Sequence, residues 1–238
     1  MKDFFLKIVN FFYPITCSVC GDDLNCLSRT KICDKCKKSF PVIRNLVCQK
    51  CGMPLYDGGE YCYVCKKRPK EYNFDKMRSV YLYKDSLRNL VLKFKYSDRF
   101  FLAEDFGSSM YEMMKLYDFY KDAEFIIPVP LNIVRRIKRG YNQAEMLADA
   151  ISSKADIPVL KKVLFRKKIT KPQFKLSKLD REKNIKDSFF VKNNDILRGK
   201  TVILIDDIVT TSATVSACSL ALKTAGAEKV CVLALARD

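Results

Sequence analysis

Histidine is absent from the 238 residues of the chain. Its absence excludes serine–histidine–aspartate and cysteine–histidine catalysis, and also every metal site that needs an imidazole ligand. Uninterrupted apolar runs long enough to cross a bilayer are missing too. The opening stretch MKDFFLKIVNFFYPITC carries Asp3 and Lys7 within its apolar part and has no small-residue cleavage site, so a secretory signal is not expected. We therefore expect a cytoplasmic protein with no stable membrane insertion.

Acidic residues are few relative to basic ones. Lys and Arg total 44 against 27 Asp and Glu, which gives a formal net charge of +17 and a pI near 9.4. A surface of this charge attracts polyanions such as nucleic acid, phosphorylated metabolites or anionic lipid. A lysine-rich surface that is merely solvated is the alternative interpretation. The length suits one medium domain plus a small module, and the 48% of hydrophobic residues are enough for a packed core.

The eleven cysteines are concentrated near the N-terminus, with nine of them in the first 65 residues. Eight form Cys-x-x-Cys pairs, which are Cys17/Cys20, Cys33/Cys36, Cys48/Cys51 and Cys62/Cys65. This spacing lets one turn point two sulfurs at a single ion, and two such turns complete a tetrahedral S₄ zinc site. The gaps between pairs favour two sequential sites, although a cross-braced arrangement would use the same eight residues. A module this small would depend on zinc for its folding energy.

Basic and aromatic side chains are interleaved with these cysteines. They include Lys31, Lys35, Lys37, Lys38, Arg44, Lys50, Lys66, Lys67, Arg68, Lys70, Tyr56, Tyr61, Tyr63 and Tyr72. Such a mixture suits single-stranded nucleic acid, because phosphates meet cations and bases stack on rings. A structural module with a solvated basic face is the alternative. Residues 1–70, including a helix expected at 2–12, are predicted to form this module.

Residues 71–238 show alternating strand and helix patterns. Strands are expected at 77–83, 124–131, 161–167, 201–207 and 229–236, and helices at 86–96, 99–117, 142–154 and 214–225. The strands are apolar runs of the kind that parallel sheets bury on both faces. The pattern predicts an α/β domain whose mostly parallel sheet is flanked by helices. The polar stretch 168–186 is predicted to be a long loop or flap.

The segment VILIDDIVTTSAT (202–214) carries the most chemistry. A buried strand is predicted to end at Asp206 and Asp207, and a helix is predicted to begin near Thr214. Free backbone N–H groups at a helix start favour a phosphate, and the hydroxyls of this loop add donors. The two carboxylates can accept hydrogen bonds from sugar hydroxyls. One site therefore fits a sugar 5-phosphate at one end and a diol at the other.

Two further stretches are basic. IPVPLNIVRRIKRGYNQAEMLA (127–148) places four cations after a rigid Pro-Val-Pro turn, which favours phosphate binding over a solvated loop. Asn142 is predicted to cap the following helix. TKPQFKLSKLDREKNIKDSF (170–189) lies in the predicted flap, and long loops in compact domains tend to be functional.

These stretches, with LKFKYSDR (92–99) and the cysteine module, resemble the ComF family over nearly the whole chain. The 202–214 segment resembles the phosphoribosyl-pyrophosphate loop of type I phosphoribosyltransferases. The resemblance implies that fold, two zinc ribbons, and phosphoribosyl pyrophosphate bound with Mg²⁺. It implies catalytic roles for Asp206 and Asp207. The implied ligand-binding residues are Thr210, Thr211, Ser212, Ala213, Thr214, Arg135, Arg139, Gly140, Gln143, Gln173, Arg181 and Lys93. Lys95 is a further candidate to face phosphate.

The chain departs from the family pattern at Ser212, where the family usually carries glycine. If the backbone there adopts a positive φ, serine costs about 1 kcal/mol relative to glycine.

Three functions are compatible with the resemblance. The first is DNA uptake in natural transformation, with contacts to single-stranded DNA and to a DNA-uptake helicase or another competence protein. The second is an enzyme that transfers ribose 5-phosphate to an acceptor in nucleotide metabolism. The third is a ligand sensor whose zinc module contacts a partner protein.

Overall fold

The computed structural model describes residues 14–25, 30–44, 46–97, 99–167, 188–192 and 194–238. The helix expected at 2–12, Cys26, and the flap residues Gln173 and Arg181 lie outside this range. Within it, none of the helices has the length and apolar character needed to cross a membrane.

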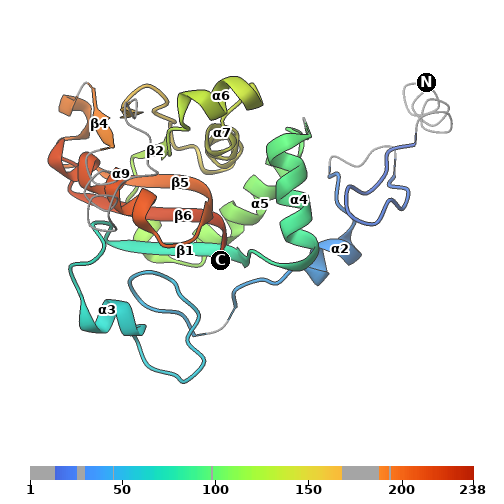
Figure 1. Ribbon diagram of the computed structural model, residues 1–238, viewed down its shortest axis with the longest axis horizontal. Coiled ribbons are helices and arrows are strands. Elements are labelled where there is room, and N and C mark those ends of the chain that lie inside the picture. Colours follow the sequence, from blue (N-terminus) through green and yellow to red (C-terminus); the bar gives the residue numbers. More distant parts are fainter. Residues whose placement is uncertain (1–13, 26–29, 45, 98, 168–187, 193) are drawn as a thin grey trace, which may run out of the picture.

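A four-stranded parallel sheet forms the centre of the molecule (Figure 1). Its order is β1 (Lys76–Leu82), β6 (Lys229–Arg237), β5 (Thr201–Val209) and β2 (Phe125–Pro128). Each neighbouring pair is parallel, and Asp206 of β5 lies beside Ala234 of β6. The α/β prediction is therefore confirmed, and β5 and β6 are the two inner strands.

Helices cover both faces of the sheet. They are α4 (Asp85–Tyr96), α5 (Leu102–Lys115), α7 (Gln143–Ala155) and α9 (Ala213–Thr224), with short 3₁₀ turns η1 (Asp118–Tyr120) and η3 (Asn194–Leu197). Alternate side chains of β5 point to opposite faces. Ile203 and Ile205 join the core cluster of α4, α5 and α7, whereas Val202 and Leu204 join the cluster of α9.

A second, two-stranded sheet lies outside the main one. Its strands β3 (Leu164–Arg166) and β4 (Phe189–Val191) are antiparallel, and both contact α9. The strand predicted at 161–167 is therefore present but does not belong to the parallel sheet. Strand β4 was not expected from the sequence.

The basic stretch after β2 contains a short helix, α6 (Ile133–Arg139), where a loop was expected. The Oδ1 atom of Asn132 accepts a hydrogen bond from the N–H of Val134 at 2.9 Å, which caps the helix start. Gly140 ends the helix at φ +77°, a conformation that glycine adopts without the cost borne by other residues. Every α6 residue except the last is exposed to solvent.

The cysteine-rich segment wraps around β1 and contributes the helices α2 (Asp34–Ser39) and α3 (Tyr63–Lys67) (Figure 1). The N–H of Ile43 donates to Val80 O, and the N–H of Leu82 donates to Pro41 O, both at 2.9 Å. The outer edge of β1 is therefore paired, which protects it from pairing with other chains. The domain boundary at residue 70 stays a prediction.

Candidate ligand-binding site and cysteine clusters

The acid pair lies where β5 leaves the core. The Oδ2 atom of Asp207 is 3.0 Å from Lys95 Nζ of α4, and both side chains are only 14% exposed. The Oδ1 atom of Asp206 accepts a hydrogen bond from the N–H of Asp207 at 2.9 Å. Lys95 is therefore a cation that faces the acid pair. Lys93, which the resemblance placed there, instead donates to Ser18 O at 3.0 Å in the cysteine-rich segment.

Asp206 has an unusual acidity. Removal from water and, secondly, the nearby charge of Asp207 raise the pKa of Asp206 to about 8. Its carboxyl group can therefore gain or lose a proton near neutral pH. Perturbed carboxyl groups of this kind gather at functional sites.

The loop between β5 and α9 encloses a small hollow of about 40 Å³. It is lined by Asp206, Ile208, Val209, Thr210, Thr211, Ser212, Ala213, Thr214 and Val215. The three threonines are exposed, so their hydroxyls are accessible to a ligand. The first N–H groups of α9 have no carbonyl partner within the helix, which makes this corner suited to an anion.

Ser212 adopts the left-handed conformation, with φ +62°, and immediately precedes α9. Its side chain is buried, at 4% exposure. This is the backbone geometry for which the family's glycine is suited, so serine carries a conformational cost here.

The last turn of α4 contacts both the acid pair and the basic stretch that follows β2. Arg139 donates to the hydroxyl of Tyr96 at 2.8 Å and to Gln143 Oε1 at 3.0 Å, and its guanidinium lies 4.6 Å from the centre of the Tyr96 ring. Lys95 and Tyr96 are adjacent, so α4 holds Asp207 with one residue and Arg139 with the next. Gly140 follows Arg139 directly.

Gln143 is 1% exposed, and within the described residues its Nε2 atom has no hydrogen-bond partner. A buried donor without a partner is costly, so a ligand acceptor at this position would offset the cost. Asn142 caps α7 as predicted, since its Oδ1 accepts from the N–H of Ala144 at 3.1 Å. Arg135 lies on the exposed part of α6. Tyr96 could not be assigned a role from sequence, because its contact with Arg139 depends on how α4 packs.

The eight paired cysteines form two clusters in sequential order. One cluster is Cys17, Cys20, Cys33 and Cys36, and the other is Cys48, Cys51, Cys62 and Cys65. The sulfurs within each cluster lie within 4.8 Å of one another. Sulfur separations of 3.8 Å (Cys20–Cys33) and 3.6 Å (Cys51–Cys62) match the edge of a tetrahedron with Zn–S bonds of about 2.3 Å. The geometry supports the sequential pairing over the cross-braced one.

Backbone N–H groups support the thiolate form of one cysteine in each cluster. Burial acts to raise the pKa of Cys17, but N–H groups of Cys33 and Cys20 outweigh it and bring that pKa to about 6. The same balance brings the pKa of Cys48 to about 7. Thiolates are the form that binds zinc.

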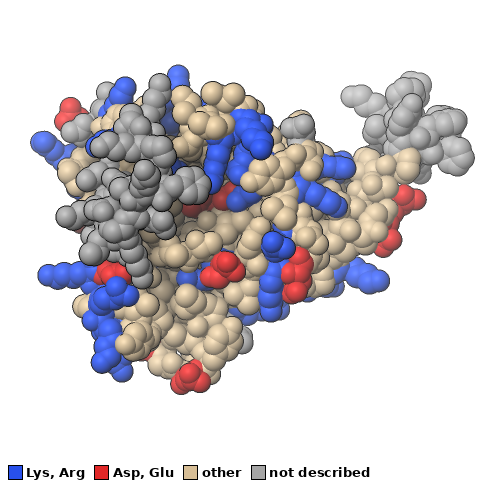
Figure 2. All heavy atoms as spheres, viewed as in Figure 1, with Lys and Arg blue, Asp and Glu red and all other residues tan. Residues whose placement is uncertain are grey.

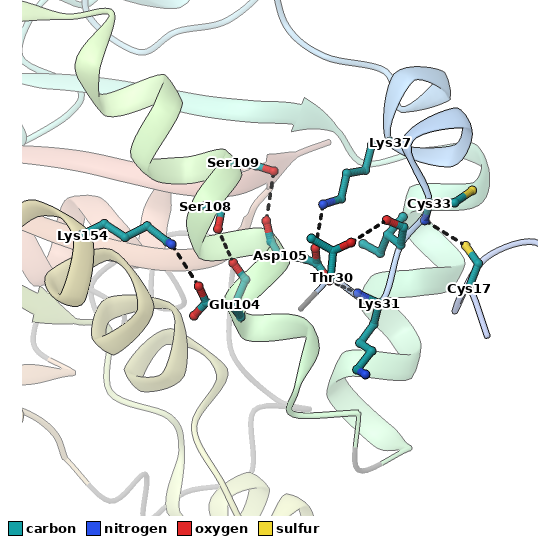
Figure 3. A network of polar contacts seen from close by, with 11 residues as sticks. Cys17, Thr30, Lys31, Cys33, Lys37, Glu104, Asp105, Ser108, Ser109 and Lys154 are labelled. Atoms are coloured by element: carbon teal, nitrogen blue, oxygen red, sulfur yellow. Dashed lines mark hydrogen bonds and ion pairs between the residues drawn. The ribbon is translucent and has the colours of Figure 1, made fainter. Parts of the chain in front are cut away.

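Buried charged residues connect both clusters to the core through hydrogen bonds and an ion pair. Asp105 of α5 accepts from the N–H of Lys31 and pairs with Lys37 Nζ, both at 2.8 Å (Figure 3). At the second cluster, Arg237 donates to Cys51 O at 2.7 Å and Arg78 to Cys48 O at 3.3 Å. Asp105, Arg78 and Arg237 were not identified as functional or structural residues from the sequence. A charged residue within an otherwise apolar strand or helix face is the sequence signal that could have indicated them.

Comparison with known proteins agrees with this architecture. A double zinc ribbon domain matches residues 8–66, and a phosphoribosyl transferase domain matches residues 123–238. Competence protein F of Haemophilus influenzae is 33% identical, covering 95% of this chain and 98% of that protein. Competence protein ComFC of Bacillus subtilis is 28% identical, covering 77% and 74%. DNA utilization protein YhgH of Escherichia coli is 26% identical, covering 94% and 97%. With its double zinc ribbon joined to a phosphoribosyltransferase domain, this chain belongs to the ComF family.

Proposed function

We propose that this chain binds phosphoribosyl pyrophosphate with Mg²⁺ at the carboxyl end of β5, and that it acts in the cytoplasm in DNA uptake, where it contacts single-stranded DNA. The relatives in Haemophilus and Bacillus are named for competence, and the one in Escherichia is named for DNA utilization. The observation that carries the proposal is the acid pair beside a hydroxyl-lined hollow at the start of α9.

The proposed binding mode assigns one part of the ligand to each group. The 5-phosphate lies in the Thr210–Thr214 loop, where hydroxyls and the first N–H groups of α9 donate to it. Asp206 and Asp207 accept from the ribose hydroxyls. Arg139 and the turn at Gly140 meet the pyrophosphate, together with the Nε2 atom of Gln143, which has no partner among the described residues. Arg135, Gln173 and Arg181 stay predicted contacts.

Carboxylate oxygens are the ligands that Mg²⁺ prefers, so the acid pair and the pyrophosphate oxygens suit this ion. Bound Mg²⁺ would neutralise charge on the pyrophosphate. The contact with Lys95 holds the Asp207 side chain in position. Arg139 is held ready for the ligand by Tyr96, which lowers the entropy that binding would otherwise cost.

Calorimetry with phosphoribosyl pyrophosphate and Mg²⁺ tests this proposal. The wild-type protein is expected to bind, and Asp206→Asn/Asp207→Asn is expected to bind at least about tenfold more weakly, because each substitution replaces a carboxyl oxygen that accepts from a ribose hydroxyl or binds Mg²⁺. The matched control is Asp118→Asn/Asp122→Asn, which makes the same two substitutions at exposed positions near η1. Absence of binding by the wild type, or equal binding by the two double variants, would overturn the assignment.

A further inference from the structure

Two hollows flank Lys76 at the amino end of β1, on the side of the second cysteine cluster. One has a volume of about 440 Å³, and its lining includes Lys50, Tyr61, Lys70, Tyr72 and Lys223. The other has a volume of about 420 Å³, and its lining includes Arg44, Gln49, Arg78, Tyr117 and Phe119. Lys76 lines both hollows, which lie along the junction between the cluster and the core, and we call the two together the groove.

The groove is strongly positive. Four lysines and two arginines line it, against a single acid, Asp75. Asp75 is already engaged, because it pairs with Lys223 Nζ at 2.8 Å and accepts from the N–H of Val230 at 2.8 Å. Within the described ranges, neither Lys70 nor Lys76 has an ion-pair partner. Figure 2 shows further Lys and Arg side chains over the part of the molecule that contains α3.

Aromatic rings line the same groove. Tyr61 is 46% exposed, so its ring can be contacted from solvent. Tyr72 stacks on Phe74, with ring centres 5.1 Å apart and an interplanar angle of 11°. Tyr117 and Phe119 line the second hollow. Rings beside cations are the combination that holds single strands, because phosphates pair with the charges and bases stack on the rings.

Arg78 provides a fixed positive charge at the wall of the second hollow. It is only 4% exposed, and its guanidinium lies 4.5 Å from the centre of the Tyr117 ring. It donates to Met77 O at 2.8 Å, and in the described part of the chain its Nε has no partner. A buried cation with an unsatisfied donor raises the attraction of this wall for an anion.

We propose that single-stranded DNA binds along this groove, with Lys70 and Lys76 contacting phosphates and Tyr61 stacking on a base. The inference rests on the DNA contact in the proposed function and gives it a location. This location is separate from the phosphosugar site. Helix α9 starts at that site with Ala213 and brings Lys223 to the groove in its last turn, about 15 Å further along the helix axis.

Fluorescence anisotropy with a labelled oligothymidylate at low salt tests the location. Lys70→Gln/Lys76→Gln is expected to bind about tenfold more weakly, and its plot of log affinity against log salt should be less steep by about 1.4, for two lost phosphate contacts. Lys154→Gln/Lys161→Gln is the matched control, because it removes the same charge from α7 and the turn that follows it. This control should keep the wild-type affinity.

The possible results distinguish an error in the location of the groove from an error in the proposed DNA contact itself. If the wild type binds the strand but both double variants bind equally well, the groove is wrong and the DNA contact stands. If the wild type does not bind, both fail. Competition by phosphoribosyl pyrophosphate would overturn the groove, because it would place the strand at the phosphosugar site. Tighter binding of the oligothymidylate–oligodeoxyadenylate duplex would also overturn it, since paired bases cannot stack on tyrosine.

Discussion

Ser212 shows how a single residue can carry strain at the centre of a site. Its φ of +62° is a conformation that L-residues other than glycine adopt at a cost, and it fixes the direction in which α9 leaves the loop. Ser212→Gly is therefore expected to raise the free energy of unfolding by about 1 kcal/mol, measured by urea denaturation. Ser153→Gly, in the ordinary helical backbone of α7, should instead lower it by about 0.5–1 kcal/mol. Destabilisation by Ser212→Gly would contradict the strain argument.

The raised pKa of Asp206 has a consequence for stability. The folded state keeps the proton up to about pH 8, whereas the unfolded chain loses it near pH 4, at about 3.9. Between these values the folded state binds more protons, so the stability contributed by Asp206 is complete below about pH 4 and is lost as the pH rises through about 8. Asp206→Asn should remove this loss and be more stable than wild type at pH 8, by about 1–3 kcal/mol.

Urea denaturation at a series of pH values, with zinc in excess, measures this effect. The absence of histidine helps, because no imidazole titrates in the same window. The exposed Asp122→Asn should reproduce the wild-type pH dependence. Parallel curves for wild type and Asp206→Asn would show that folding does not raise the pKa of Asp206.

At the scale of elements, α5 and the first cysteine cluster are joined through Asp105. Asp105→Asn removes the ion pair with Lys37. The Asp105 side chain in this pair is only 1% exposed. The first cluster should therefore open more readily, by about 1–3 kcal/mol, and release its zinc about tenfold faster or more. The second cluster does not contact Asp105 and should be unaffected.

A chromophoric chelator can follow the release of the two ions from the intact protein. One zinc equivalent should leave faster in Asp105→Asn while the other keeps its wild-type rate. Asp34→Asn is the control, since this exposed residue lies in the same segment. Equal acceleration of both ions, or of neither, would rule out this role for Asp105.

The elements themselves were largely predictable, because their signals are local. The period of the apolar residues gave the strands and helices of the main sheet, and the Cys-x-x-Cys spacing gave both clusters. Helix α6 was missed because its evidence is a cap at Asn132 and a glycine stop rather than an apolar face. The pairing of β3 with β4 was missed because a strand's partner cannot be deduced from its own residues.

In the candidate site, too, the residues that are contiguous in sequence could be predicted, and those brought together from distant segments could not. Asp206, Asp207 and the threonine loop are contiguous in sequence, so their chemistry could be predicted together. Tyr96 and Arg78 could not be assigned, because their roles depend on contacts between distant segments. Lys93 and Lys95 were both candidates to face phosphate, and they differ in their contacts because two helix residues only two positions apart point in different directions.

At the scale of the whole molecule, both cysteine clusters are in direct contact with the α/β domain. The clusters are attached by Asp105, Arg78 and Arg237, which belong to α5, β1 and β6. The proposed sugar and DNA sites then lie at opposite ends of α9. Substitutions at one site are therefore expected to leave the other intact, as the two binding experiments require.

The hydrogen bonds that residues 41–43 make to β1 bear on how this protein can be divided. A fragment cut at the predicted boundary of residue 70 would keep every strand of the main sheet yet leave the outermost one bare along its length. Such a fragment would tend to self-associate through that strand, however well its sugar-binding loop is formed. The cysteine-rich segment thus covers the outer edge of the sheet, and we expect the two parts of the chain, although separable in sequence, to fold together.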